Sequence, residues 1–439
     1  MSNYMDQIIS DKIKEIKEAK NIYETGRITR IRDYIVEVAG LEDAFYFEEV
    51  RIGNKAIGYV SNISTNTVIV SIVKLYDDIY VNDEVSRTKK EFVMQYSLDS
   101  IGHVVDIFGF NQLNKQKFQD CVDFSLNTKP VTIMERRGVT RPLYTGIAGI
   151  DLLYPIGKGQ RQLIIGDKKT GKTQIALDAI LNQKGKDVFC IYVSVGKTKK
   201  SVKEIHQQLA SRGAMEYTII LAATNDEKPP VLSLTPYGAF AIAEKYMLQG
   251  IDVLVVIDDL TRHADVHREI ALYSGKEPGR DAYPADIFYA HSKMLEKGCQ
   301  HQDGGSITVL PICETRGGDI TDYISTNIIS ITDGQVVLSK KSYDKGQKPA
   351  INYGLSVSRL GGAVQEKDVK RVGTKVRREL LSYLETREIY ELANIDEMGE
   401  ELQKKLRQGQ ELLTNFTQYK FTPIDPDFMV QRFAAIIEE

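Results

Sequence analysis

The chain has 439 residues, long enough for about two to four domains, each with its own core. Lys and Arg number 57 against 60 Asp and Glu, and this net charge of −3 argues against a basic nucleic-acid-binding protein. No apolar run is long enough to cross a bilayer and the N-terminus has no apolar secretory core, so we expect a cytoplasmic protein without membrane insertion. The cysteines lack metal-binding spacing and are expected to be buried thiols: Cys121, Cys190, Cys299 and Cys313.

The N-terminal part is predicted to hold a helix and then a barrel. Residues 4–20 place apolar side chains at helical spacing among charged ones, so residues 1–24 form an amphipathic helix that packs on its own domain or on a peripheral partner. Residues 25–92 contain short β-branched runs separated by Gly, Asn or Asp: Arg27–Val38, Ala56–Val60 and Thr67–Val73. Short strands at this spacing predict a small closed β-barrel.

Residues 93–365 are predicted to form an α/β domain with a mainly parallel sheet. Apolar strands alternate there with helical stretches, at Val188–Val193, Thr218–Ala222, Val253–Ile257 and Ile307–Ile312. Residues 366–439 are rich in Lys, Arg, Glu and Leu and predict a helical domain. Ligands of such sheets bind at the carboxyl ends of the strands.

A phosphate-binding loop follows the apolar run Leu163–Ile165. Its sequence is Gly166-Asp167-Lys168-Lys169-Thr170-Gly171-Lys172-Thr173, the Walker A pattern. The glycines Gly166 and Gly171 let backbone N–H groups turn toward a phosphate. Lys172 reaches the terminal phosphates, and Thr173 offers a hydroxyl to Mg²⁺. Residues 174–180 read as a helix, which would place the phosphate at a helix N-terminus.

Two further positions bear on the chemistry of this loop. Asp258 ends the apolar run Val253–Ile257, and a carboxylate there suits holding Mg²⁺ through a water molecule. Hydrolysis also needs a group that orients or activates water, and the loop after strand 188–193 carries Lys197, which cannot accept a proton at neutral pH. This favours nucleotide binding without turnover, although a carboxylate from another loop stays an alternative.

His263 and His267 are four residues apart, the spacing of a zinc pair on one helix face. No third ligand with suitable spacing is evident. Polar packing is therefore the favoured interpretation and metal binding the alternative.

With these motifs in place, the chain resembles the alpha subunit of F-type ATP synthases and ATPases over about residues 24–410. The matching segments, in family order, are Pro155–Arg161, the phosphate loop, Pro278–Tyr289, Asn327–Gly334 and Pro349–Arg359. The resemblance implies an N-terminal barrel, a RecA-like P-loop domain and C-terminal helices, in a rotary motor. It also implies an alternating hetero-hexamer with a catalytic beta-type partner around a central, gamma-type stalk.

The resemblance further implies roles for individual residues. An alpha-type site holds Mg-ATP or Mg-ADP without hydrolysing it, so the chain belongs to an ATP-hydrolysing or ATP-synthesising complex without being catalytic itself. Arg359 matches the family's arginine finger, which reaches the γ-phosphate bound by the neighbour and stabilises charge developing on it. Gln408 and Gln410 match the segment that contacts adenine.

Some positions depart from the family pattern. Lys169 and Lys197 stand where the family usually has Gln, and the sequence ends at Glu439, before the helical domain of an ordinary alpha subunit would end. These departures favour a specialised, C-terminally shortened paralogue, of the kind found in wall-less bacteria and in some cases linked to gliding motility machinery. The alternatives are a housekeeping alpha subunit, a self-sufficient hexameric protein-export ATPase, and an RNA-translocating ring, which would need an RNA-binding surface in its N-terminal domain.

Overall fold

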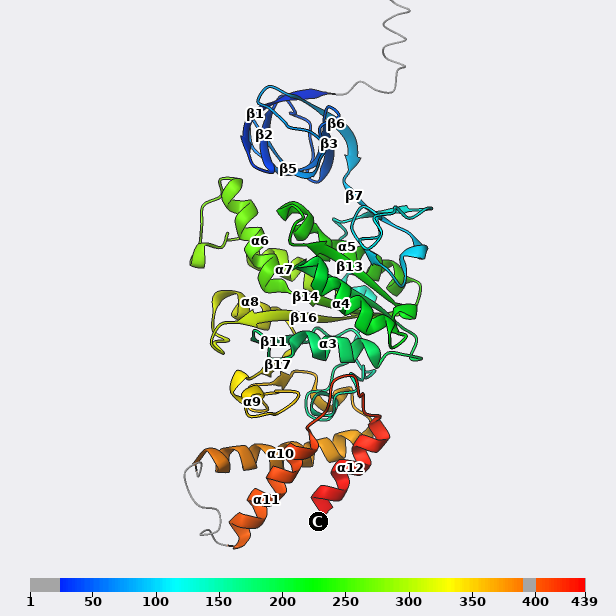
Figure 1. Ribbon diagram of the computed structural model, residues 1–439, viewed down its shortest axis with the longest axis vertical. Helices are drawn as coiled ribbons and strands as arrows, with labels where there is room; N and C mark the ends of the chain where they lie inside the picture. The colour runs from blue at the N-terminus through cyan, green and yellow to red at the C-terminus, as the bar shows by residue number, and fades with distance from the viewer. Residues whose placement is uncertain (1–23, 390–399, 439) are drawn as a thin grey trace, which may run out of the picture. The chain divides into compact units, whose positions relative to one another are not determined.

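The computed structural model describes residues 24–389 and 400–438 (Figure 1). The amphipathic helix predicted for residues 1–24 lies almost wholly outside these residues. The described chain divides into two compact units. The first holds the residues up to Val93 with Lys228–Pro230 and Glu269–Lys276, and the second holds the remainder.

The first unit is a closed antiparallel barrel, visible as the blue ring of strands in Figure 1. Its strands are β1 (Thr25–Arg32), β2 (Ile35–Ala39), β3 (Glu48–Ile52), β4 (Ala56–Ile63), β5 (Val68–Leu75) and β6 (Glu84–Glu91), in the spatial order β1-β2-β5-β4-β3-β6. The predicted run Arg27–Val38 is two strands, because Asp33 turns the chain with a φ of 56°. The buried side chains of Val36, Val50 and Val70 fill the interior.

The second unit is built on a sheet of eight strands in the order β18-β17-β11-β16-β14-β12-β13-β8. Every neighbouring pair is parallel except β17 and β18, which are antiparallel. The bounds are β8 (Val104–Val105), β11 (Leu163–Asp167), β12 (Val188–Lys197), β13 (Thr218–Thr224), β14 (Asp252–Asp258), β16 (Ile307–Thr315), β17 (Gly334–Leu338) and β18 (Val357–Ser358). Two small two-stranded sheets pair β7 (Val93–Tyr96) with β9 (Val122–Ser125) and β10 (Arg136–Arg137) with β15 (Gln300–His301).

Helices occupy the connections between these strands and the C-terminal part of the chain. Along the sheet they are α2 (Ala148–Asp151), α3 (Lys172–Leu181), α4 (Lys199–Ala210), α5 (Pro229–Leu248), α6 (Leu260–Tyr273), α7 (Ile287–Leu295), α8 (Tyr323–Ile331) and α9 (Lys340–Asp344). The C-terminal helices are α10 (Lys367–Ile389), α11 (Glu400–Asn415) and α12 (Pro426–Glu438). The predicted fold class of barrel, mainly parallel α/β domain and C-terminal helices is confirmed.

Burial follows the apolar pattern of the sequence. The strands β12, β13 and β14 are buried almost throughout, as expected for a parallel sheet covered on both faces. Cys190, Cys299 and Cys313 are buried free thiols, whereas Cys121 is half-buried. Within the described residues, no helix combines the length and the apolar character that a bilayer crossing requires.

Candidate nucleotide-binding site

The phosphate loop joins the buried strand β11 to the N-terminus of α3. Gly171 precedes the helix with a φ of 103°, in the left-handed region that favours glycine. A Cβ atom on Gly166 would lie 2.7 Å from the carbonyl oxygen of Leu338 on β17, so the neighbouring strand leaves no room for a side chain there. The first turn of α3 has N–H groups without acceptors in the helix and carries partial positive charge, so the loop and this turn together suit a phosphate group.

The loop is held by its own side chains. The Lys172 Nζ atom donates to the carbonyl oxygens of Gly166 at 2.8 Å and Asp167 at 2.6 Å. Thr170 Oγ1 also donates to the Asp167 carbonyl at 2.8 Å, and the Asp167 carboxylate accepts from Thr315 Oγ1 on β16 at 2.7 Å. Burial lowers the pKa of Lys172. The ammonium group is thus inside the loop, where a terminal phosphate would bind.

The other loop lysines lie outward. Lys168 and Lys169 are exposed, and Lys169 has a φ of 63°. Lys168 Nζ lies 3.4 Å from the Glu314 carboxylate at the end of β16. These cations add positive charge at the mouth of the loop without being part of its hydrogen-bonded frame.

Asp258 forms the second half of the site, at the carboxyl end of β14. Its carboxylate is 2% exposed and accepts hydrogen bonds from Thr173 Oγ1 at 2.7 Å and from the Tyr192 hydroxyl at 2.6 Å. Lys197 Nζ lies 2.9 Å from its other oxygen. Burial, reinforced by the charge of Asp258, raises the pKa of the adjacent Asp259 to about 6. The structure therefore brings Thr173 and Asp258 together as the sequence predicts, and adds Tyr192 and Lys197.

Thr173 and Asp258 fit a magnesium ion that is bound mainly through phosphate. Mg²⁺ at phosphate sites takes one or two carboxylates or hydroxyls and completes its shell with water and phosphate oxygens. In residues 24–389 and 400–438, no group of three or more His, Cys, Asp or Glu could hold a metal by itself. The chemistry of the Thr173 and Asp258 oxygens thus suits a metal that arrives with a nucleotide rather than one held by the protein alone.

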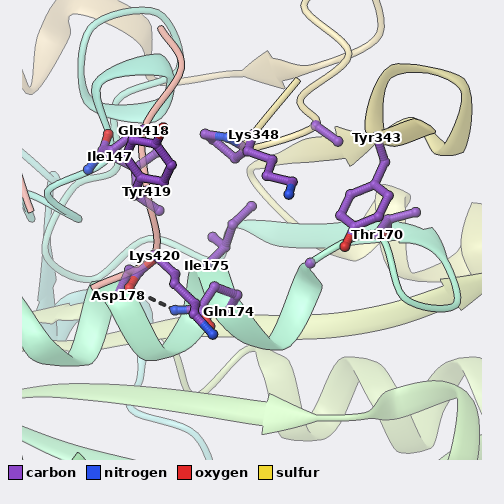
Figure 2. A pocket seen from close by; sticks show the side chains of 13 residues that line it. Ile147, Thr170, Gln174, Ile175, Asp178, Tyr343, Lys348, Gln418, Tyr419 and Lys420 are labelled. Carbon is purple, nitrogen blue, oxygen red and sulfur yellow. Dashed lines mark hydrogen bonds between the residues drawn. The ribbon is translucent and has the colours of Figure 1, made fainter. Parts of the chain in front are cut away.

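A cavity of about 360 Å³ opens beside the phosphate loop and the first turns of α3 (Figure 2). It is lined by Ile147, Thr170, Gly171, Gln174, Ile175, Asp178, Tyr343, Lys348, Pro349, Ala350, Gln418, Tyr419 and Lys420. Tyr343 lies on one side of the cavity and Gln418 and Tyr419 lie on the other. Its mixture of aromatic, aliphatic and polar groups suits a small organic ligand.

The segment that closes this cavity is anchored to the phosphate-loop region. Gln418 Nε2 donates to the carbonyl oxygens of Gly146 and Thr422, each at 2.7 Å, and its Oε1 accepts from the Ala148 N–H at 3.2 Å. Asp178 on α3 accepts from the backbone N–H of Phe421 at 2.8 Å. Burial raises the pKa of Asp178 to about 6.

Gln408 and Gln410, the residues expected to contact adenine, do not line this cavity. Both belong to α11, where Gln408 Nε2 donates to the Ile436 carbonyl of α12 at 3.0 Å. Gln410 Oε1 accepts from the Tyr383 hydroxyl of α10 at 2.6 Å. The chain returns to the phosphate-loop region only after α11 ends, and there Gln418 lines the cavity. A glutamine beside an aromatic residue, here Tyr419, is too common a pairing to single out this position from the sequence.

Arg359 lies apart from this cavity, in the segment after β18. Its backbone N–H donates to the Asp333 carbonyl at 2.9 Å, which fixes the main chain. The exposed side chain donates through Nη2 to the Ile329 carbonyl at 3.2 Å. The main chain at Arg359 is therefore held in place, while the guanidinium group is exposed.

The two histidines at four-residue spacing have different partners. His263 is fully buried, with its ring nitrogens 3.2 Å from the Ser233 carbonyl and 3.3 Å from His291 Nε2. His267 Nε2 lies 2.8 Å from the Asp286 carboxylate. Burial lowers the pKa of His263 to about 4, so this ring is neutral at physiological pH.

Comparison with known proteins places the chain in a family. Residues 146–358 match the model of the ATP synthase alpha/beta family, nucleotide-binding domain. The chain is 40% identical to ATP synthase subunit alpha of Pediococcus pentosaceus over 432 residues, covering 98% of this chain and 85% of that one. The alpha subunits of Lactiplantibacillus plantarum and Streptococcus agalactiae are each 39% identical, over 99% and 96% of this chain and 86% and 85% of their own lengths. Such identity over nearly the whole chain, together with the phosphate loop and the three-part fold, shows that it belongs to the ATP synthase alpha-subunit family.

Proposed function

We propose that the chain is the non-catalytic, Mg-nucleotide-binding subunit of a rotary F-type or F-type-like ATPase. It binds Mg-ATP or Mg-ADP with its phosphate on the loop Gly166–Thr173 and its base in the adjoining cavity. Thr173 and Asp258 would hold the metal, whose charge offsets that of the phosphates. Gln418 and Tyr419, rather than Gln408 and Gln410, would face the base.

The observation that carries the non-catalytic role is the position of Lys197. This ammonium group lies beside Asp258, at the end of β12, where a hydrolytic site needs a carboxylate or Gln to orient the attacking water. A lysine cannot accept the proton at neutral pH. Asp259 and Glu314 are further carboxyl groups near Lys172, so turnover by the chain alone has to be measured.

Arg359 is proposed to act on the nucleotide bound by a neighbouring subunit. In an alternating ring of alpha-type and beta-type subunits around a central stalk, its exposed guanidinium would stabilise charge on the γ-phosphate bound by the neighbouring beta-type subunit. Such an arginine contributes about 10³–10⁵ in rate in other nucleotide hydrolases. The ring would be peripheral to a membrane rather than inserted in it.

Two versions of this role differ in what the ring drives. One is a specialised paralogue, in which the ring powers other machinery such as a gliding apparatus. The other is the housekeeping alpha subunit of an ATP synthase, which the names of the relatives at about 40% identity favour at least as strongly. Purification of the native complex separates them, since co-purification with proton-translocating membrane subunits would exclude the specialised version.

The subunit role is tested by ATP hydrolysis of the chain alone, of its native complex, and of that complex with Arg359→Ala. We expect negligible turnover by the chain, robust turnover by the complex and a loss of about a hundredfold or more in the variant. Arg371→Ala is the matched control, because Arg371 is 70% exposed on α10 and its Nη2 atom lies 3.6 Å from the carboxylate of Asp368 on the same helix. Strong turnover by the isolated chain would make this subunit catalytic and refute the proposal.

A further inference from the structure

An ammonium group already lies on the carboxylate that would help to hold Mg²⁺. Lys197 Nζ is 2.9 Å from one oxygen of Asp258, and the Lys197 side chain is 22% exposed while that of Asp258 is 2% exposed. The other oxygen accepts from Thr173 and Tyr192. Three donors thus occupy a carboxylate that has about four acceptor positions.

The ion pair sits within the nucleotide site rather than on the surface. Asp258 is joined through Thr173 to the first turn of α3, where the phosphate loop ends. The sheet holds the main chain of this segment. Ser194 of β12 pairs with Asp258 of β14, and Lys197 of β12 pairs with Thr224 of β13. Strand pairing therefore fixes the main chain of Lys197, and the ion pair with Asp258 places its amine.

We infer that Lys197 is a built-in cation of this site, which neutralises Asp258 so that a nucleoside di- or triphosphate binds without Mg²⁺ almost as tightly as with it. This inference rests on the proposed nucleotide site. The inference adds that Mg²⁺ is largely dispensable for nucleotide binding at that site.

The electrostatic argument has two parts. An unpaired buried carboxylate beside a phosphate loop repels a polyphosphate, and a bound metal normally removes that repulsion by lying between the two. Lys197 removes it permanently, while Lys172 inside the loop meets the phosphate directly. A metal ion must also compete with the Lys197 ammonium group for Asp258, so the free energy gained by adding Mg²⁺ is reduced.

The test is equilibrium binding of a fluorescent ADP analogue to the full-length chain, in excess Mg²⁺ and in EDTA. For the wild-type chain we expect dissociation constants that agree within about threefold. For Lys197→Gln, which leaves Asp258 without its cation, we expect binding in EDTA to be weaker than in Mg²⁺ by about tenfold or more. Lys200→Gln is the matched control, since Lys200 is 86% exposed on α4 and should keep the wild-type ratio.

The outcomes are distinguishable. A wild-type affinity that falls about tenfold or more on chelation overturns the inference and leaves the nucleotide site intact. The same small ratio in Lys197→Gln as in the wild type overturns the role of Lys197. No binding in either condition overturns both the inference and the proposed function. Thermal unfolding checks that Lys197→Gln is folded, and if it is not, the wild-type ratio alone decides.

Discussion

Replacing Gln418 by alanine tests which glutamine faces a bound nucleotide: Gln418, which lines the cavity, or Gln408 and Gln410, which the resemblance implies. The variant removes side-chain hydrogen bonds to Gly146, Ala148 and Thr422. Each hydrogen bond contributes about 1 kcal/mol. Because Gln418 is half-buried, water replaces part of this loss, and the segment that closes the cavity becomes less stable by about 2 kcal/mol. Since about 1.4 kcal/mol is a tenfold change in an equilibrium constant, a loss of about 2 kcal/mol should lower nucleotide affinity by about thirtyfold.

Titration of the fluorescent ADP analogue measures this change. Gln408→Ala is the matched control: it removes the hydrogen bond to the Ile436 carbonyl and should lower thermal stability while leaving affinity within about twofold of the wild type. If Gln408→Ala weakened binding as much as Gln418→Ala, the reasoning from the cavity would be refuted and the original sequence prediction restored. An unchanged affinity in Gln418→Ala would show that the Gln418 side chain does not support nucleotide binding.

Other substitutions test the packing and the buried charges of the second unit. Gly409→Ala should lower the free energy of unfolding by about 2–3 kcal/mol in urea, because its Cβ atom would lie 2.1 Å from Cγ of Tyr383 on α10; an unchanged midpoint would contradict this close helix contact. His263, which faces His291, has a pKa lowered to about 4 by burial, so the stability it contributes is present above about pH 6.5 and is lost as the pH falls toward 4. The free energy of unfolding should therefore fall less in His263→Gln than in the wild type between pH 7.5 and pH 5. Equal falls would show that protonation of His263 does not cause the loss of stability at low pH.

Much of the central sheet could be predicted because its strands are continuous apolar runs. The predicted strand Val253–Ile257 corresponds to β14, and Asp258 ends it as expected. The barrel strands β3 and β6 are harder to predict. Their sequences are Glu-Glu-Val-Arg-Ile and Glu-Val-Ser-Arg-Thr-Lys-Lys-Glu, and strands with one exposed face contain few apolar residues. Local pattern thus predicts buried strands better than exposed ones.

The site was predictable only where neighbouring residues in the chain make it. The phosphate loop is one contiguous segment, so its residues could be named in advance. Tyr192 and Gln418 could not, because their roles depend on contacts across 66 residues to Asp258 and across 270 residues to Ala148. The extent of β12 was also missed: Ser194-Val-Gly reads as a loop, but strand pairing continues to Lys197 and fixes its main chain.

The walls of the cavity come from segments that are far apart in the sequence. Ile147 precedes α2, Gln174 is on α3, Lys348 follows α9 and Gln418 follows α11. A nucleotide between them would act as a non-covalent cross-link that joins the C-terminal helices to the sheet. At a hundredfold excess over its dissociation constant it would add about 2.7 kcal/mol to the stability of the folded chain. A site without turnover would therefore still stabilise the folded chain by linking these distant segments.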